Sequence, residues 1–118
     1  LSSGLANPNV FVDGGNMVFT GVASENDDVT IVIDGTNYRL SDANKPLIAG
    51  PGAIQDGNDV LVSIASVTGT ININTGDGND NLTVNLNGGL FTKDINFDGG
   101  NDTDGIAVSS NTTLNTIT

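Results

Sequence analysis

The pair Asn-Asp recurs along this chain, each time ahead of an apolar, strand-like run, and this recurrence constrains the fold more than any other feature. The pair occupies positions 26–27, 58–59, 79–80 and 101–102. The last two intervals are each about 22 residues, a length typical of one repeat unit, and the first interval is longer. Its excess falls in SDANKPLIAGP, residues 41–51, which contains two prolines. We therefore expect residues 41–51 to be a loop inserted into one repeat.

Apolar residues repeat with a similar period. Three columns share one spacing: Val62, Val84 and Ile106; Ile64, Leu86 and Val108; Ile73, Ile95 and Ile117. In a solenoid, each coil lays its apolar side chains on those of the preceding coil. The pattern predicts a right-handed parallel β-helix (β-solenoid) with coils of about 22 residues, in which Val84 lies between Val62 and Ile106.

The composition also favours an all-β chain. Thirteen of the fourteen acidic residues are Asp, the three basic residues are Lys45, Lys93 and Arg39, and strong helix formers are scarce. A length of 118 residues fits one solenoid domain spanning residues 1–118. Within it, residues 1–22 are expected to form a hairpin-like N-terminal cap, because alternating strands flank Asp13-Gly14-Gly15-Asn16.

Stacked coils would place the Asn residues of the repeated pair in one column, where their amides can hydrogen-bond to one another. The Asp residues would form a second column, and they would repel one another unless they were exposed, protonated or bridged by a cation. The expected columns are Asn58, Asn79 and Asn101, and Asp59, Asp80 and Asp102.

The segment TGDGNDNL, residues 75–82, resembles the calcium-binding nonapeptide of RTX (hemolysin-type) repeats, with Thr75 in place of the first glycine. QDGNDVL (55–61) and FDGGNDTDGI (97–106) are partial relatives. The resemblance implies Ca²⁺ bound by backbone carbonyls and by the carboxylates of Asp77 and Asp80, and in the partial copies Asp56, Asp59 and Asp102. The alternative interpretation is a tight turn, in which Gly and Asn adopt positive φ and Asp caps backbone amides.

Several classes of function are disfavoured. A net charge of -11 argues against binding to nucleic acid or to anionic membranes, and no apolar run is long enough for membrane insertion. The absence of His and Cys removes the commonest general base, the commonest nucleophile and the usual zinc ligands. We therefore predict that the chain is not an enzyme.

The repeat also resembles Asn-Asp-x-[VIL]-x-[VIL] units of large bacterial surface, adhesin-like proteins. This resemblance implies a secreted or cell-surface location in a bacterium and a structural role as a stalk, adhesin or matrix module stabilised by calcium. Two alternatives stay open. The C-terminal run TTLNTIT has no polar cap, so the chain could be a subunit that stacks end to end into a homo-oligomer or filament. The other is a β-helix that binds or cleaves carbohydrate. A surface glycan or a surface protein is the expected kind of partner if the chain does not assemble with itself.

Overall fold

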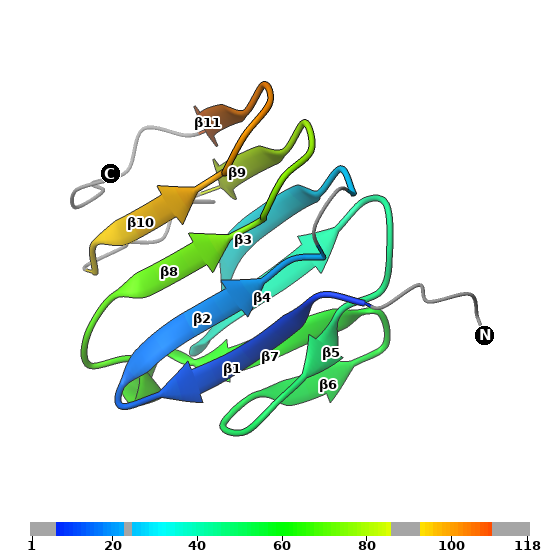
Figure 1. The fold of residues 1–118 in the computed structure, drawn as a ribbon. Coiled ribbons are helices and arrows are strands. Elements are labelled where there is room, and N and C mark those ends of the chain that lie inside the picture. Colours follow the sequence, from blue (N-terminus) through cyan, green and yellow to red (C-terminus); the bar gives the residue numbers. More distant parts are fainter. Residues whose placement is uncertain (1–6, 23–24, 86–92, 110–118) are drawn as a thin grey trace.

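The computed structural model describes residues 7–22, 25–85 and 93–109, which form two β-sheets packed face to face (Figure 1). The first sheet has the strand order β10-β8-β2-β1-β5. Its strands are β1 (Asn9–Asp13), β2 (Asn16–Thr20), β5 (Ile48–Ala49), β8 (Ile71–Asn74) and β10 (Ile95–Asp98). The second sheet has the order β11-β9-β3-β4-β7-β6. Its strands are β3 (Asp28–Asp34), β4 (Asn37–Asp42), β6 (Ile54–Asp56), β7 (Asp59–Ser63), β9 (Asn81–Asn85) and β11 (Gly105–Ser109).

Alternate residues point to opposite faces of a strand, and in most of these strands every second residue is apolar and buried, which turns one face inward. In β9, for example, Leu82 and Val84 are buried, whereas Asn81 is exposed. The buried apolar side chains of both sheets form a single core that includes Phe19, Ile31, Leu40, Ile73 and Ile95. A short 3₁₀ turn, η1 (Ile64–Ser66), follows β7. No helix of the described residues is long and apolar enough to cross a membrane.

The expected hairpin near the N-terminus is formed by β1 and β2, which pair antiparallel with Asp13 opposite Asn16. The two turn residues, Gly14 and Gly15, have φ angles of 58° and 86°. A two-residue hairpin turn with positive φ at both positions matches the right-handed twist of the strands, and glycine adopts it without steric cost.

Six strands form what we call the stacked region: β2, β3, β8, β9, β10 and β11. The chain passes from the first sheet to the second three times within it, from β2 to β3, from β8 to β9 and from β10 to β11 (Figure 1). We call each pass a layer. Ile71 pairs in parallel with Ile95, and Asn81 pairs with Gly105. The last two layers are therefore offset by 24 residues, the separation that also joins Asn72 to Asn96 and Asp80 to Asp104.

The other part of the second sheet is the meander region, which consists of β4, β6 and β7. It continues the sheet from β3, and each pair in the order β3-β4-β7-β6 is antiparallel. The chain is therefore all-β as expected, but the predicted right-handed parallel β-helix is wrong. Both sheets are mixed, because antiparallel pairs adjoin the parallel ones in each.

The predicted apolar column shows where the error arose. Val62 lies in the meander region and pairs with Tyr38, whereas Val84 lies between Ile31 and Val108 in the backbone register. Ile106 is displaced along its strand and pairs with Leu82. The predicted spacing of about 22 residues and the observed spacing of 24 differ by two residues, which is one full period of a β-strand. Both spacings therefore keep the same faces inward, and the apolar pattern alone cannot distinguish them.

The segment 41–51 is also more ordered than the predicted inserted loop. It contains the last two residues of β4 and all of β5, which pairs in parallel with β1. The two proline residues flank β5 on either side and are not part of it. Leu86, Ile117 and the C-terminal run 112–118 lie outside the described residues, so the corresponding expectations are not addressed by the structure.

Candidate functional site

Three aspartates form a column at the turns of the stacked region, each immediately before a strand of the second sheet. These are Asp27 before β3, Asp80 before β9 and Asp104 before β11. The backbone N–H of Asp27 donates to Oδ1 of Asp80 (2.8 Å), and the N–H of Asp80 donates to Oδ1 of Asp104 (3.1 Å). We call these residues the aspartate column. Each of these two acceptor side chains caps the backbone of the preceding layer, and so the column joins three layers.

A second column runs beside the first, one residue earlier in each layer. The N–H of Asn79 donates to Oδ1 of Asn26 (2.8 Å), and the N–H of Thr103 donates to Oδ1 of Asn79 (3.0 Å). The expected amide ladder of Asn58, Asn79 and Asn101 is therefore wrong. Thr103 takes the place of Asn101 because the offset is 24 residues, and Asn58 lies in the turn between β6 and β7.

The first two layers of the stacked region hold their aspartates away from solvent. Asp27 is 1% exposed and Asp80 is fully buried. Backbone approaches this carboxyl group closely at Gly21, where an added Cβ would lie only 2.5 Å from Oδ2 of Asp27 and 2.6 Å from the carbonyl oxygen of Thr75. A residue larger than glycine at position 21 would therefore displace either the carboxyl group or the neighbouring layer.

The end of β4 and the loop that follows it bring an acid, Asp42, and a base, Lys45, to Asp27. Lys45 Nζ lies 3.6 Å from Oδ1 of Asp27 and also contacts Oε1 of Glu25. Oδ1 of Asp42 accepts from the backbone N–H groups of Asp28 (3.2 Å) and Asn44 (2.9 Å). We call Glu25, Asp27, Asp42, Lys45 and Asp80 the buried acidic cluster.

Four oxygens of this cluster are buried without a hydrogen-bond donor: both carboxyl oxygens of Asp27, Oδ2 of Asp42 and Oδ2 of Asp80. Two carboxyl groups can hydrogen-bond to each other only when one is protonated. Burial raises the pKa of Asp27 to about 7, and the contact with Asp42 contributes to this rise against the opposing charge of Lys45. Between about pH 4 and 7, Asp27 therefore carries a proton that an ordinary aspartate would have lost.

Two neighbouring groups respond to the same environment. Burial raises the pKa of Asp80, although hydrogen bonds from the backbone of Asp27 and from Thr75 oppose the shift. Burial acts to lower the pKa of Lys45, but its hydrogen bond to Glu25 and the charge of Asp27 outweigh burial and raise it. Lys45 is thus held as an ammonium group between two acidic side chains.

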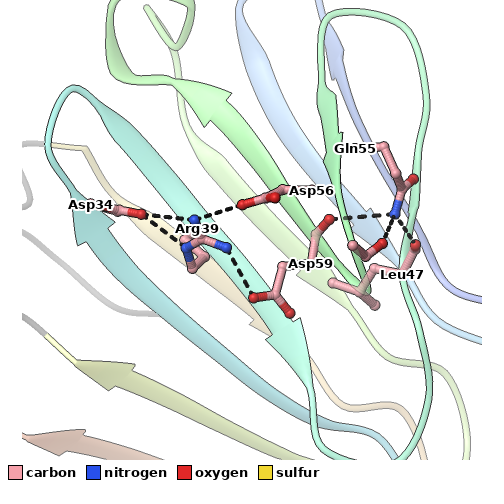
Figure 2. Close-up of polar contacts among 7 residues, drawn as sticks. Asp34, Arg39, Leu47, Gln55, Asp56 and Asp59 are labelled. Carbon is pink, nitrogen blue, oxygen red and sulfur yellow. Dashed lines mark hydrogen bonds and ion pairs between the residues drawn. The ribbon is translucent and has the colours of Figure 1, made fainter.

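A second group of carboxylates surrounds Arg39 on β4 (Figure 2). Its guanidinium group donates to Asp34 (2.9 Å), Asp56 (2.8 Å) and Asp59 (3.1 Å). We call these four residues the arginine cluster. Half of the side-chain surface of Asp34 and Asp56 remains exposed. The hydrogen bonds to Asp56, Asp34 and Asp59 raise the pKa of Arg39. The cluster ties the β3–β4 hairpin to the β6–β7 turn.

The five predicted calcium ligands fall in two separate places. Asp56 and Asp59 belong to the arginine cluster, whereas Asp77, Asp80 and Asp102 lie in the turns of the stacked region. There, Oδ1 of Asp77 accepts from the N–H of Asn101 (3.2 Å), and Oδ2 of Asp102 accepts from the N–H of Gly78 (3.0 Å). Within residues 7–22, 25–85 and 93–109, no three acidic side chains are grouped so that they could hold a metal ion.

Sequence reasoning missed most of the buried acidic cluster. Asp27 follows Asn26 in the repeated pair, which gives it the same position as Asp80, and this equivalence was the available signal. Asp104 would have been found with an offset of 24 residues from Asp80. Lys45 and Asp42 carried no signal, because they approach Asp27 only through the pairing of β3 with β4.

A scan against protein-family models and searches of curated proteins and of solved structures returned no match for this chain.

Proposed function

We propose that this chain is a non-enzymatic structural module of a bacterial extracellular or cell-surface protein, such as a stalk, adhesin or matrix component. The observation that carries this proposal is the direct bonding between layers at the turns. Asp80, Asp104, Asn26 and Asn79 each use a side-chain oxygen to accept a backbone N–H of an adjacent layer. Side chains used in this way brace the backbone, which is what a load-bearing module requires.

Single-molecule force measurements test the proposal. The chain is placed in tandem with a reference β-sandwich domain, and Asp80→Ala is compared with the matched control Asp98→Ala. Oδ1 of Asp98 accepts from the nearby N–H of Gly100, whereas Asp80 joins two layers. We expect a high unfolding force that Asp80→Ala lowers and Asp98→Ala leaves unchanged. An unfolding force far below that of the reference domain, or release of sugar from incubated polysaccharides, would contradict the proposal.

Calcium is part of this proposal with a narrower set of ligands than the sequence indicated. Asp56 and Asp59 are poor candidates because their carboxylates already bind the guanidinium group of Arg39, whose positive charge would repel a bound cation. Asp77 and Asp102 come from adjacent layers and bind reciprocally to each other's turns, so a cation between these turns would offset their mutual repulsion. The side chains do not form a complete coordination shell, and backbone carbonyls and water would have to supply the other oxygens.

A further inference from the structure

Lys45 and Asp27 lie close together in a position that solvent barely reaches. Nζ of Lys45 is 3.6 Å from Oδ1 of Asp27, and the two side chains are 11% and 0% exposed. Their positions are held from both sides. Asn44 donates to the carbonyl oxygen of Asn26 (2.9 Å), and the N–H of Leu47, whose side chain is buried in the core, donates to the carbonyl oxygen of Asn58 (2.9 Å). The amine and the carboxyl group are therefore kept close together at little further entropic cost.

From this geometry we propose that Lys45 and Asp27 condense into an intramolecular isopeptide bond between Nζ and Cγ. The bond requires neither calcium nor the load-bearing role proposed above. It would join the turn before β3 to the loop after β4 and so enclose the β3–β4 hairpin. In a chain without cysteine, such a bond restricts the unfolded state as a disulfide would.

The surroundings select Asp27 over the other acids that Lys45 meets. Oδ1 of Asp42 accepts two backbone N–H groups, which stabilise the unreactive carboxylate form. Glu25 is 29% exposed on its side chain, so water would compete there. Both oxygens of Asp27 are buried without a hydrogen-bond donor, so no hydrogen bond stabilises its carboxylate form, and burial favours the neutral carboxyl group by raising its pKa. A protonated, dry carboxyl group is the form that can lose its hydroxyl as water.

Glu25 supplies the base for the reaction because its carboxylate contacts Nζ directly. The ammonium group of Lys45 passes one proton to Glu25, and the free amine attacks Cγ of Asp27. A second proton from nitrogen joins the departing hydroxyl of Asp27, so the Cγ–O bond breaks, one water leaves and the Nζ–Cγ amide remains. Glu25 then returns its proton to solvent. No oxidant or cofactor is needed for this balance.

Mass spectrometry of the denatured chain tests the bond. The intact mass should be lower than that of the sequence by one water. Trypsin can cut after Arg39 and Lys93, whereas Lys45 precedes Pro46 and is protected. In the wild type, peptides 1–39 and 40–93 should stay joined after reduction and boiling, with fragment ions that locate the bond at Asp27 and Lys45. Cyclisation of an Asp-Gly pair also removes water, but it leaves these two peptides separate.

Variants distinguish the reacting groups. Lys45→Arg and Asp27→Ala should each restore the full mass and release the two peptides, and Glu25→Gln should strongly reduce the joined fraction. Lys93→Arg is the matched control, which keeps the bond and the tryptic site. Separate peptides in the wild type, joined peptides in Lys45→Arg, or a bond located at Glu25 or Asp42 would each overturn the proposal. The wild-type digestion does not depend on whether any variant folds.

Discussion

Two groups of acidic residues in this molecule are each organised around one base, and they differ mainly in solvation. In the arginine cluster, Asp34 and Asp56 are half exposed, and the guanidinium group of Arg39 meets three carboxylates within 3.1 Å. In the buried acidic cluster, Asp27 and Asp80 are almost completely buried, and both of their pKa values are raised. Similar residues therefore form exposed ion pairs in one place and a proton-holding site in the other.

The difference follows from the strand arrangement in each region. Antiparallel hairpins of the meander region place their turns at the periphery, where solvent screens the charges of the arginine cluster. Parallel layers place equivalent turns above one another, so the turns of neighbouring layers cover one another. Asp27 in the first layer and Asp80 in the second layer are therefore shielded from water. Burial of a carboxyl group is thus a consequence of stacking, and the two regions should respond differently to substitution, pH, calcium and salt.

The largest effect should come from the core that both regions share. Leu82→Ala in the stacked region and Leu40→Ala in the meander region should each lower the free energy of unfolding by about 2–5 kcal/mol. Both side chains are fully buried in one core, so each variant should still unfold in a single transition by circular dichroism and by fluorescence. Ile54→Ala, at a side chain that is 56% exposed, is the control and should have little effect. Separate transitions for the two regions would contradict a shared core.

The pH dependence of stability should distinguish the buried cluster from the exposed one. In Lys45→Arg, Asp27 keeps its carboxyl group and its buried position, and burial is the main cause that raises its pKa from 3.8 to about 7 in the unsubstituted chain. Between these values, the folded chain binds a proton that the unfolded chain releases, so this group's contribution to stability falls as pH rises from about 4 to 7. The loss should be on the order of 4 kcal/mol, since a rise of about three pKa units is converted at about 1.4 kcal/mol per unit.

Urea unfolding at a series of pH values measures this slope. Adding Asp27→Asn to Lys45→Arg removes the titrating group and should flatten the curve over the same range. The wild type should also lack most of this slope, because the isopeptide bond consumes the carboxyl group. An unchanged slope in the double variant would assign it to other residues.

Calcium should have a smaller effect, confined to the turns of the stacked region. At a concentration ten times its Kd, calcium should raise the free energy of unfolding by about 1.4 kcal/mol, and EDTA should reverse this increase. The variant Asp77→Asn with Asp102→Asn should lose the response, whereas Asp56→Asn with Asp59→Asn should retain it. Thermal melts with calcium and with EDTA provide the measurement. Identical melting temperatures in both conditions would exclude calcium from the folded state.

The smallest effect should come from the arginine cluster. Arg39→Gln removes ion pairs that solvent screens, so we expect a slight decrease in melting temperature that disappears at high salt. Arg39→Lys should recover only part of it, because an ammonium group cannot form the same fork of hydrogen bonds. A large decrease in melting temperature that persists at high salt would contradict this expectation. It would show that the arginine cluster stabilises the fold despite its exposure to solvent.

Local features of the fold could be predicted from the sequence, whereas the pairing of distant segments could not. The alternation in LTVN and the Gly14-Gly15 turn gave a strand and a hairpin at the correct residues. The spacing between layers was misjudged because a shift by one strand period leaves every inward-facing side chain inward. Residues 26–42 pair antiparallel where a coil was expected, since the Asn26-Asp27 and Asn58-Asp59 motifs are similar but belong to different kinds of turn.

Only the local part of the candidate site could be predicted from the sequence, because the rest depends on the pairing of distant segments. Asp80 could be predicted as a site residue because its motif, TGDGNDNL, is local in the sequence. In the structure, the N–H of Asp80 donates to Asp104 in the next layer. Asp27 is its equivalent, yet its neighbours Lys45 and Asp42 reach it through a hairpin whose register no sequence pattern specified. Burial of charge depends on such distant pairing, so neither the raised pKa of Asp27 nor its contact with Lys45 could be read from the chain.

The central claim is that the last two layers of the stacked region are offset by 24 residues, and a pair of engineered cysteines tests it most directly. Asn72 and Asn96 are register partners whose side chains hydrogen-bond at 2.9 Å, and the chain has no cysteine of its own. Paired positions on adjacent strands lie about 4.8 Å apart, within the range that a disulfide spans. The variant Asn72→Cys with Asn96→Cys should oxidise to an intramolecular disulfide, and Asn72→Cys with Asp94→Cys should keep free thiols. Rapid oxidation of the second pair with free thiols in the first would contradict the account.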